Sequence, residues 1–492
     1  MREKKVQSCK ARKPLAAPLC DPAPAISPVP SSRRHILERW LTGGTILVVL
    51  LAAVRQLQLC RLHAVNVLYW DQWGYYSKVW DPSWSLWDLF TMQHGPHRGG
   101  VGYVLCRLLL PWTHADVRVD GFAVILIVMF CSLVTLAIRR RLTGELRWHD
   151  ASLVLLFLTP GAAEMVANTP NPTHGALPLL FVLLSALAWT IHSRLRRYLC
   201  VLPLNFLAIF TGFGFFWGLV TPLLLGYDLC SAARRRDWRG AWSAGLVLLL
   251  AIGSLVMFFH GYLWSTGSSA GPVAPDPLRY LTFASLAWAR AAGIVGTGAI
   301  PLGLGGILAA TCGVVVIYCT AQSARQSGHC QQQCLVPGAL ILFSMLFTAG
   351  MCHGRAQLDI DAAQAPRYVP LMLPGLVGLY LCILNLRRTG LRVVLLTVFL
   401  VAGGWAGFHL DSRDAAEMSR YSSGKRRWVA AYLQTRDAAA ADRLSDFEVS
   451  PNKDRLTGRL KELERLHLSL FARGQQVPPA ANAVPSTRNS AE

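Results

Sequence analysis

The sequence predicts an all-α protein that crosses a membrane about eleven times. Of its 492 residues, 53% are hydrophobic and only 15% are charged. Several apolar runs approach or exceed the roughly 20 residues that a helix needs to span the core of a bilayer. Because a segment in lipid must satisfy its own backbone hydrogen bonds, these runs predict helices and not open strands.

The expected spans follow one another with short connections. In chain order they are Leu41–Leu59, Val119–Ile138, Ala151–Ala167, Gly175–Ile191, Tyr198–Thr211, Phe215–Cys230, Ala241–His260, Ile294–Cys319, Leu335–Cys352, Tyr368–Leu386 and Leu391–Leu410. The fifth and sixth are short. The sequence TGFGFFWG between them is compatible with a tight outer turn or with a break inside one long helix.

Basic residues mark alternate connections between the expected spans. The net charge of +21 is concentrated in clusters such as Arg33–Arg34, Arg139–Arg141, Arg194 to Arg197 and Arg234–Arg236. This is the positive-inside pattern, so we expect these connections and the N-terminus to be cytoplasmic and the protein to lie in the inner membrane. A nucleic-acid-binding protein would gather such charges on one soluble face, so we expect no nucleic-acid partner.

Three regions differ in composition. Residues 1–34 are rich in Pro, Ala and Ser and predict a disordered cytoplasmic leader. Residues 35–410 form the expected transmembrane domain. Residues 411–492 are polar, with helical spacing of leucines, and predict a small helical tail. With eleven spans this tail is extracytoplasmic, and it would change sides if 198–230 were one span.

The first outer loop, 60–118, is unusually aromatic. Five of its rings recur at spacings of three and four: Trp73, Tyr76, Trp80, Trp84 and Trp87. Because Pro82 interrupts this rhythm, we expect two short interfacial helices. The favoured interpretation of the rings is an aromatic belt at the depth of the lipid headgroups.

The outer connections hold most of the side chains that are able to do chemistry. Asp71 follows the first span directly, where an acidic group is costly unless it has a partner or a role. The other candidates are His94, His97 and Arg98 in the first loop, His174 in the second outer connection, and Arg355, Arg367 and Tyr368 in a later one.

These outer motifs resemble those of the membrane-embedded GT-C glycosyltransferases. The likeness lies in the acidic residue and Trp-rich loop after the first span, in the His94-x-x-His97-Arg98 motif, and in Gly354-Arg355 followed by Ala365-x-Arg367-Tyr368. The resemblance implies transfer of a sugar from a polyprenyl-phosphate donor to an extracytoplasmic acceptor, with inversion at the anomeric carbon. This chain departs from the pattern at Gln72 and Pro96, where an acidic residue would be expected.

Each residue has an expected role in such a reaction. Asp71 is the expected base, because a carboxylate near an acceptor hydroxyl can remove its proton. The guanidinium groups of Arg355 and Arg367 match phosphate oxygens, and Tyr368 can donate to the same group. We expect His94, His97, Arg98 and His174 to contact substrate.

Several alternatives remain open at the level of sequence. Asp71 is also placed to cap a helix or to pair with Arg98. In that case the base would be Asp81, Asp88 or His97. His94 and His97 could form a zinc pair, and Asp359 and Asp361 resemble a metal-binding motif, but no third ligand is obvious. We therefore expect no cofactor and no metal.

Two other functional classes compete with the transferase. One is a transporter or flippase for a lipid-linked saccharide, which typically places ionisable residues near the middle of the membrane and beside broken helices. The other is a non-catalytic membrane scaffold. The nearly charge-free spans and the polar outer face favour the enzyme.

Overall fold

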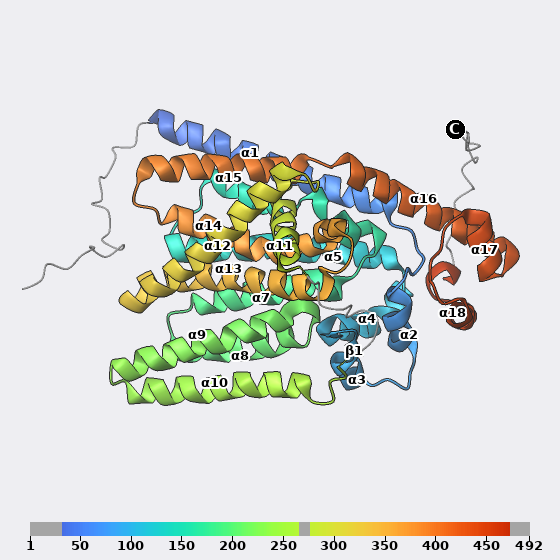
Figure 1. The fold of residues 1–492 in the computed structure, drawn as a ribbon, viewed down its shortest axis with the longest axis horizontal. Coiled ribbons are helices and arrows are strands. Elements are labelled where there is room, and N and C mark those ends of the chain that lie inside the picture. The colour runs from blue at the N-terminus through green and yellow to red at the C-terminus, as the bar shows by residue number, and fades with distance from the viewer. Residues whose placement is uncertain (1–31, 265–275, 473–492) are drawn as a thin grey trace, which may run out of the picture.

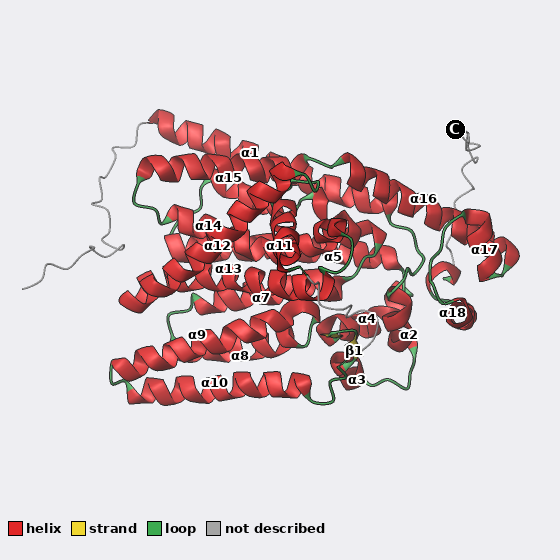
Figure 2. Cartoon of the chain, viewed as in Figure 1, coloured by secondary structure: helices red, strands yellow, loops and turns green. Residues whose placement is uncertain are grey.

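The computed structural model of the protein describes residues 32–264 and 276–472. Most of the expected leader, 1–34, therefore lies outside the described residues, as do part of the connection 261–293 and the end of the tail. The described part of the chain is almost entirely helical, as Figure 2 shows. Its two strands, Gln93–His94 (β1) and His97–Arg98 (β2), form one antiparallel pair.

Within the described residues, 9 helices are long and apolar enough to cross a membrane. This agrees with the expectation of an all-α polytopic protein. The helices are α1 (Ser32–His63), α5 (Val117–Thr143), α7 (Leu177–Trp189) with the π-helical turn η4 (Pro172–Ala176) before it, α9 (Phe215–Arg234), α10 (Trp238–Phe259), α12 (Ala299–Arg325), α13 (Gly328–Arg355), α14 (Val369–Leu384) and α15 (Thr389–Phe408).

Two of the eleven expected spans are not continuous long helices. The run Ala151–Ala167 forms α6 (Ala151–Phe157), a 3-10 turn (Pro160–Ala162, η2) and a π-helical turn (Glu164–Asn168, η3), because Pro160 ends the regular helix. The other is α8 (Arg194–Ile209), which has 16 residues. It contacts α9 and is joined to it by η5 (Gly212–Gly214), so TGFGFFWG is a tight turn and not a break in one helix.

The short helix α6 is held by a close approach to α15. All seven residues of α6 are buried. A Cβ atom added at Gly403 would lie 2.9 Å from the Ser152 carbonyl oxygen, and one at Gly407 would lie 2.8 Å from Leu155 Cβ. Two glycines four residues apart therefore allow the two backbones to pack closely, as small residues do between membrane helices.

The first outer loop contains three helices. They are α2 (Gln72–Trp80), α3 (Leu86–Thr91) and α4 (Gly100–Thr113). The break between the first two lies at the expected place around Pro82, and Ser85 begins α3 with a capping box to Asp88. We did not expect α4. This helix has 14 residues and contains Pro111, so it is too short to span a bilayer. A search for membrane-spanning apolar runs therefore does not predict it.

The tail folds against the first outer loop. Its helices α16 (Ser412–Thr435), α17 (Ala438–Ser445) and α18 (Lys453–Arg465) lie at the same end of the molecule as α2, α3 and α4 (Figure 1). Trp73, Tyr76 and Trp80 are 1%, 3% and 4% exposed, and they share one hydrophobic cluster with Trp428 of α16. The expected aromatic belt is therefore wrong for these three rings, which pack against protein.

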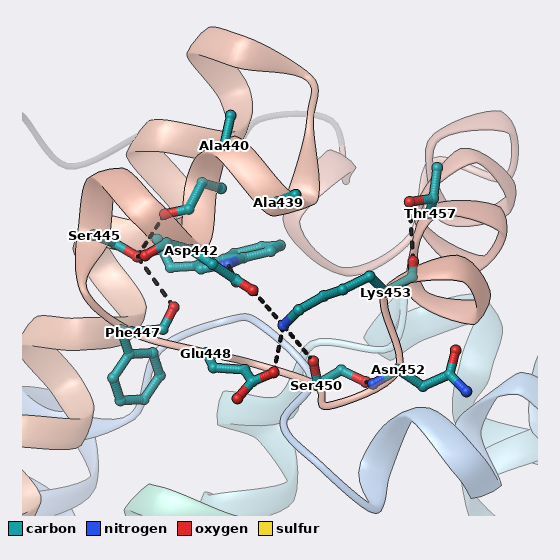
Figure 3. A network of polar contacts seen from close by, with 12 residues as sticks. Ala439, Ala440, Asp442, Ser445, Phe447, Glu448, Ser450, Asn452, Lys453 and Thr457 are labelled. Carbon is teal, nitrogen blue, oxygen red and sulfur yellow. Dashed lines mark hydrogen bonds and ion pairs between the residues drawn. The ribbon is translucent and has the colours of Figure 1, made fainter.

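A polar network fixes the turn between α17 and α18. Lys453 donates to the Ser450 carbonyl oxygen over 2.7 Å and forms ion pairs with Asp442 and Glu448 (Figure 3). Within the same turn, the Val449 carbonyl oxygen accepts a hydrogen bond of 2.9 Å from the backbone N–H of Trp70. The tail is thus tied to the residue that immediately precedes Asp71.

Candidate functional site

Asp71 lies at the start of α2 with a free carboxylate. Trp70 has a left-handed backbone (φ 49°), and Gln72 donates to the Pro170 carbonyl oxygen over 2.7 Å, so the chain is held on both sides of Asp71. The Asp71 side chain makes no capping hydrogen bond and is exposed. Among the described residues it has no hydrogen-bond or ion-pair partner, so neither the capping role nor the pairing with Arg98 describes this structure.

His94 packs against the face of α2 that begins at Asp71. Residues three and four apart share a helix face, so Gly74 and Tyr75 lie on the same side as Asp71. A Cβ at Gly74 would lie 3.0 Å from Cε1 of His94. The Tyr75 ring centroid is 6.4 Å from that of His94, and Tyr75 stacks on Tyr103 at 4.9 Å. The face that carries Asp71 therefore borders the imidazole of His94.

Three histidines gather beside this face. His94 and His97 are opposite each other in the β1–β2 pair, where directly opposed side chains point to the same face. His174, in η4, has its ring centroid 6.2 Å from that of His94 and 5.5 Å from that of His97. In the described ranges, no group of three His, Cys, Asp or Glu residues is arranged to hold a metal ion.

Close backbone contacts hold the histidine cluster together. Gly212 has φ +52°, and a Cβ there would lie 2.4 Å from the Thr173 carbonyl oxygen and 2.9 Å from the Cα of His174. Only glycine fits this position without strain. Phe213 follows, and its ring centroid lies 4.1 Å from that of His97. The turn between α8 and α9 is therefore part of the wall of the cluster.

The environment of His97 keeps its imidazole neutral. Burial lowers the pKa of His97 well below its ordinary value, and nearby His174, His94 and Arg355 lower it further. A neutral imidazole can donate from one ring nitrogen and accept at the other. His97 is thus suited to hydrogen bonding with a substrate and not to carrying a positive charge.

Arg355 is the available cation of the cluster. It is the last residue of α13, it is exposed, and its side chain has no hydrogen bond or ion pair with any described residue. Its charge reaches His97, since it contributes to the lowered pKa of that imidazole. An unpaired guanidinium therefore acts on His97, while the free carboxylate of Asp71 lies at the start of the helix whose Gly74 and Tyr75 contact His94.

Arg367 and Tyr368 lie farther from the histidines. Nη1 of Arg367 forms an ion pair of 2.6 Å with Oε1 of Glu164, and its guanidinium stacks on Tyr368. The contacts that connect Tyr368 to His97 run through two intervening rings, Phe347 and Phe213. Sequence reasoning missed Glu164, because it lies 203 residues from Arg367 inside an expected span.

The side chain of Arg98 is bound to the backbone of neighbouring segments. Its guanidinium donates to the carbonyl oxygens of Thr91, Phe258 and His260 and is 7% exposed as a residue. These bonds join the first outer loop to the end of α10. Both Nη atoms of Arg98 are thus bonded to the backbone, and only the buried Nε has no partner among the described residues, so Arg98 is placed to hold the loop and not to bind a phosphate.

Lys425 is a further residue that the sequence did not single out. It is 1% exposed, its ammonium donates to the Asn168 carbonyl oxygen, and it lies 4.8 Å from the centroid of the Tyr69 ring. The carbonyl ends the π-helical turn η3, and Tyr69 precedes Trp70 and Asp71. Lys425 of α16 therefore braces both of the chain segments that lead into the site.

Comparisons with known proteins give no independent assignment. No protein-family model matches the sequence, and a search of curated proteins finds no match.

Proposed function

We propose that the protein is a membrane glycosyltransferase that moves a sugar from a polyprenyl-phosphate donor to an extracytoplasmic acceptor. The observation that carries the proposal is that two opposite charges without partners lie at one end of an apolar helical bundle. The carboxylate of Asp71 and the guanidinium of Arg355 lack described partners. Asp71 precedes Gly74 and Tyr75, which contact His94, and the charge of Arg355 acts on His97.

In this mechanism Asp71 accepts the proton of the acceptor hydroxyl as its oxygen attacks the anomeric carbon. The new bond between that oxygen and carbon forms while the bond from carbon to the phosphate oxygen breaks. The polyprenyl phosphate leaves with an added negative charge, which Arg355 stabilises. Neutral His97 and its neighbours His94 and His174 orient the sugar. A single displacement inverts the anomeric centre.

The test compares Asp71→Asn with the matched variant Asp81→Asn. Both remove one carboxylate from the same loop, but Asp81 bonds to Ser83 in a turn and not to the site. Asp71→Asn should lower transfer at least about a hundredfold, the smaller effect expected for losing a general base. Asp81→Asn should keep most activity. Transfer is measured in proteoliposomes with a panel of polyprenyl-phosphate sugars, together with donor binding and thermal stability.

Normal transfer by a folded Asp71→Asn protein that binds donor would rule out Asp71 as the base. Glu164, which pairs with Arg367, would then be tested in its place.

A second candidate function is transport of a lipid-linked saccharide. The observation that favours it is the discontinuous stretch α6–η2–η3–η4, because transporters bind substrates at broken helices. The same proteoliposomes separate the two functions. A transporter would move an intact labelled lipid-linked saccharide between leaflets, whereas a transferase would release polyprenyl phosphate and label the acceptor.

A further inference from the structure

A polar cavity lies at the opposite end of the bundle from the histidine cluster, among the ends of α7, α8, α9 and α13 (left in Figure 1). Its volume is about 230 Å³, and it is lined by Trp189, His192, Arg194, Arg197, Arg235 and Gln332 among others. Ligand pockets for drug-sized molecules hold about 300–1,000 Å³. The cavity is therefore suited to a smaller group.

The lining of this cavity carries more positive than negative charge, with three arginines and one aspartate. The segment 192–240 contains seven arginines and two aspartates. Asp228 pairs with Arg197 over 2.7 Å, and Asp237 pairs with Arg194 over 2.7 Å. Arg235 lines the cavity and has no side-chain hydrogen bond or ion pair to a described residue. An anion that enters would meet a guanidinium that is not already neutralised.

Buried polar atoms in the wall lack partners. Gln332 is 7% exposed, and its Oε1 accepts no hydrogen bond from the described residues. Trp189 is 2% exposed, and its Nε1 donates none; Nε of Arg197 is also unpartnered. Buried polar groups are normally paired. These three unpaired atoms belong to side chains that line the cavity, so they are free to bond to a ligand once the side chains turn toward it. The positive-inside rule explains arginines at a membrane surface but not these unpaired atoms.

We propose that this cavity binds the phosphate of an anionic headgroup that also carries a hydroxyl or ammonium donor. Arg197, Arg235 and Nε1 of Trp189 would donate to the phosphate oxygens, and Oε1 of Gln332 would accept from the neighbouring donor group. Basic pockets between membrane helices are known to suit lipid phosphates. The site is at the end opposite to Asp71, so it does not depend on the proposed glycosyl transfer.

The experiment uses the full chain in nanodiscs and compares Arg235→Gln with Arg234→Gln. Both variants remove one charge from the same cluster, but only Arg235 lines the cavity. Phosphatidylglycerol binding against a phosphatidylcholine background is measured by native mass spectrometry. Arg235→Gln should weaken it at least tenfold and Arg234→Gln less than twofold. Gln332→Glu, which keeps the size of the side chain, should also weaken it through repulsion.

Inorganic phosphate distinguishes the source of the ligand. If phosphate protects the protein against heating and Arg235→Gln abolishes that protection, while phosphatidylglycerol shows no preference, the phosphate site stands and its ligand is soluble. Equal losses for Arg235→Gln and Arg234→Gln would mean a diffuse surface charge and would overturn the site. So would the absence of any response to both phosphatidylglycerol and phosphate.

Discussion

Three aspartates of one outer loop show how local contacts decide a residue's role. The carboxylate of Asp81 bonds to Ser83, and that of Asp88 bonds to Ser85, and these bonds lower the pKa of each acid. Both carboxylates are therefore weak proton acceptors held in turns or caps. Asp71 lacks such bonds although it stands at the N-cap position of α2. Of the three carboxylates, that of Asp71 is therefore the one available to accept a proton from a substrate.

The two candidate arginines should respond differently to removal. Arg355→Ala should weaken donor binding at least about tenfold, because hydrogen bonds to charged groups contribute about 1.5–3 kcal/mol, while stability stays unchanged. Arg367→Ala should instead lower the melting temperature, because it leaves the half-buried carboxylate of Glu164 unpaired. Donor titration and thermal unfolding measure the two effects. Equal donor-binding losses in both variants would contradict this division.

At the scale of elements, the long helices could be predicted because an apolar run of sufficient length has few alternatives. The interrupted run Ala151–Ala167 could not, since its short helix depends on glycines of α15 more than 240 residues later. The His94–His97 hairpin was not predicted as strands, although Gly95 and Pro96 already excluded a regular helix there. Long-range pairs such as Arg367 with Glu164 leave no local signal in the sequence.

The turn between α8 and α9 gives a test at this scale. A residue with a Cβ in the left-handed backbone conformation costs roughly 1–2 kcal/mol. Gly212→Ala should lower the free energy of unfolding by more than this, because the added Cβ would also clash with Thr173. Activity should fall as well, since Phe213 and His174 would shift. The matched variant is Gly226→Ala in α9, where a Cβ meets nothing within 4 Å. Thermal unfolding of both variants checks the prediction, and equal stability would refute it.

At the scale of the whole molecule, the two ends of the bundle differ in chemistry. One end carries α2, α3, α4 and the tail around the histidine cluster, and the other carries the arginine-rich connections (Figure 1). Two pairs of charged residues buried between helices neutralise each other, Arg139 with Asp150 over 3.0 Å and Arg290 with Asp414 over 2.6 Å. This separation follows from the cost of isolated charges in lipid.

This polarity predicts opposite accessibility of the two ends. Single cysteines at Ser83 and Leu358, in a background without native cysteines, should react with an impermeant thiol reagent added from outside. Cysteines at Arg236 and Arg388 should react only after the membrane is permeabilised, because basic connections stay in the cytoplasm. If the first pair fell on opposite sides of the membrane, Asp71 and Arg355 would not share a site.

The close fit of α6 to Gly403 and Gly407 has a consequence for biosynthesis. A helix of seven residues is too short to enter a bilayer as an independent unit. Its docking surface on α15 does not exist until the ribosome has added about 250 further residues. Integration of this stretch is therefore a late event of assembly, so a chain that stalls before α15 would expose the segment to quality-control proteases.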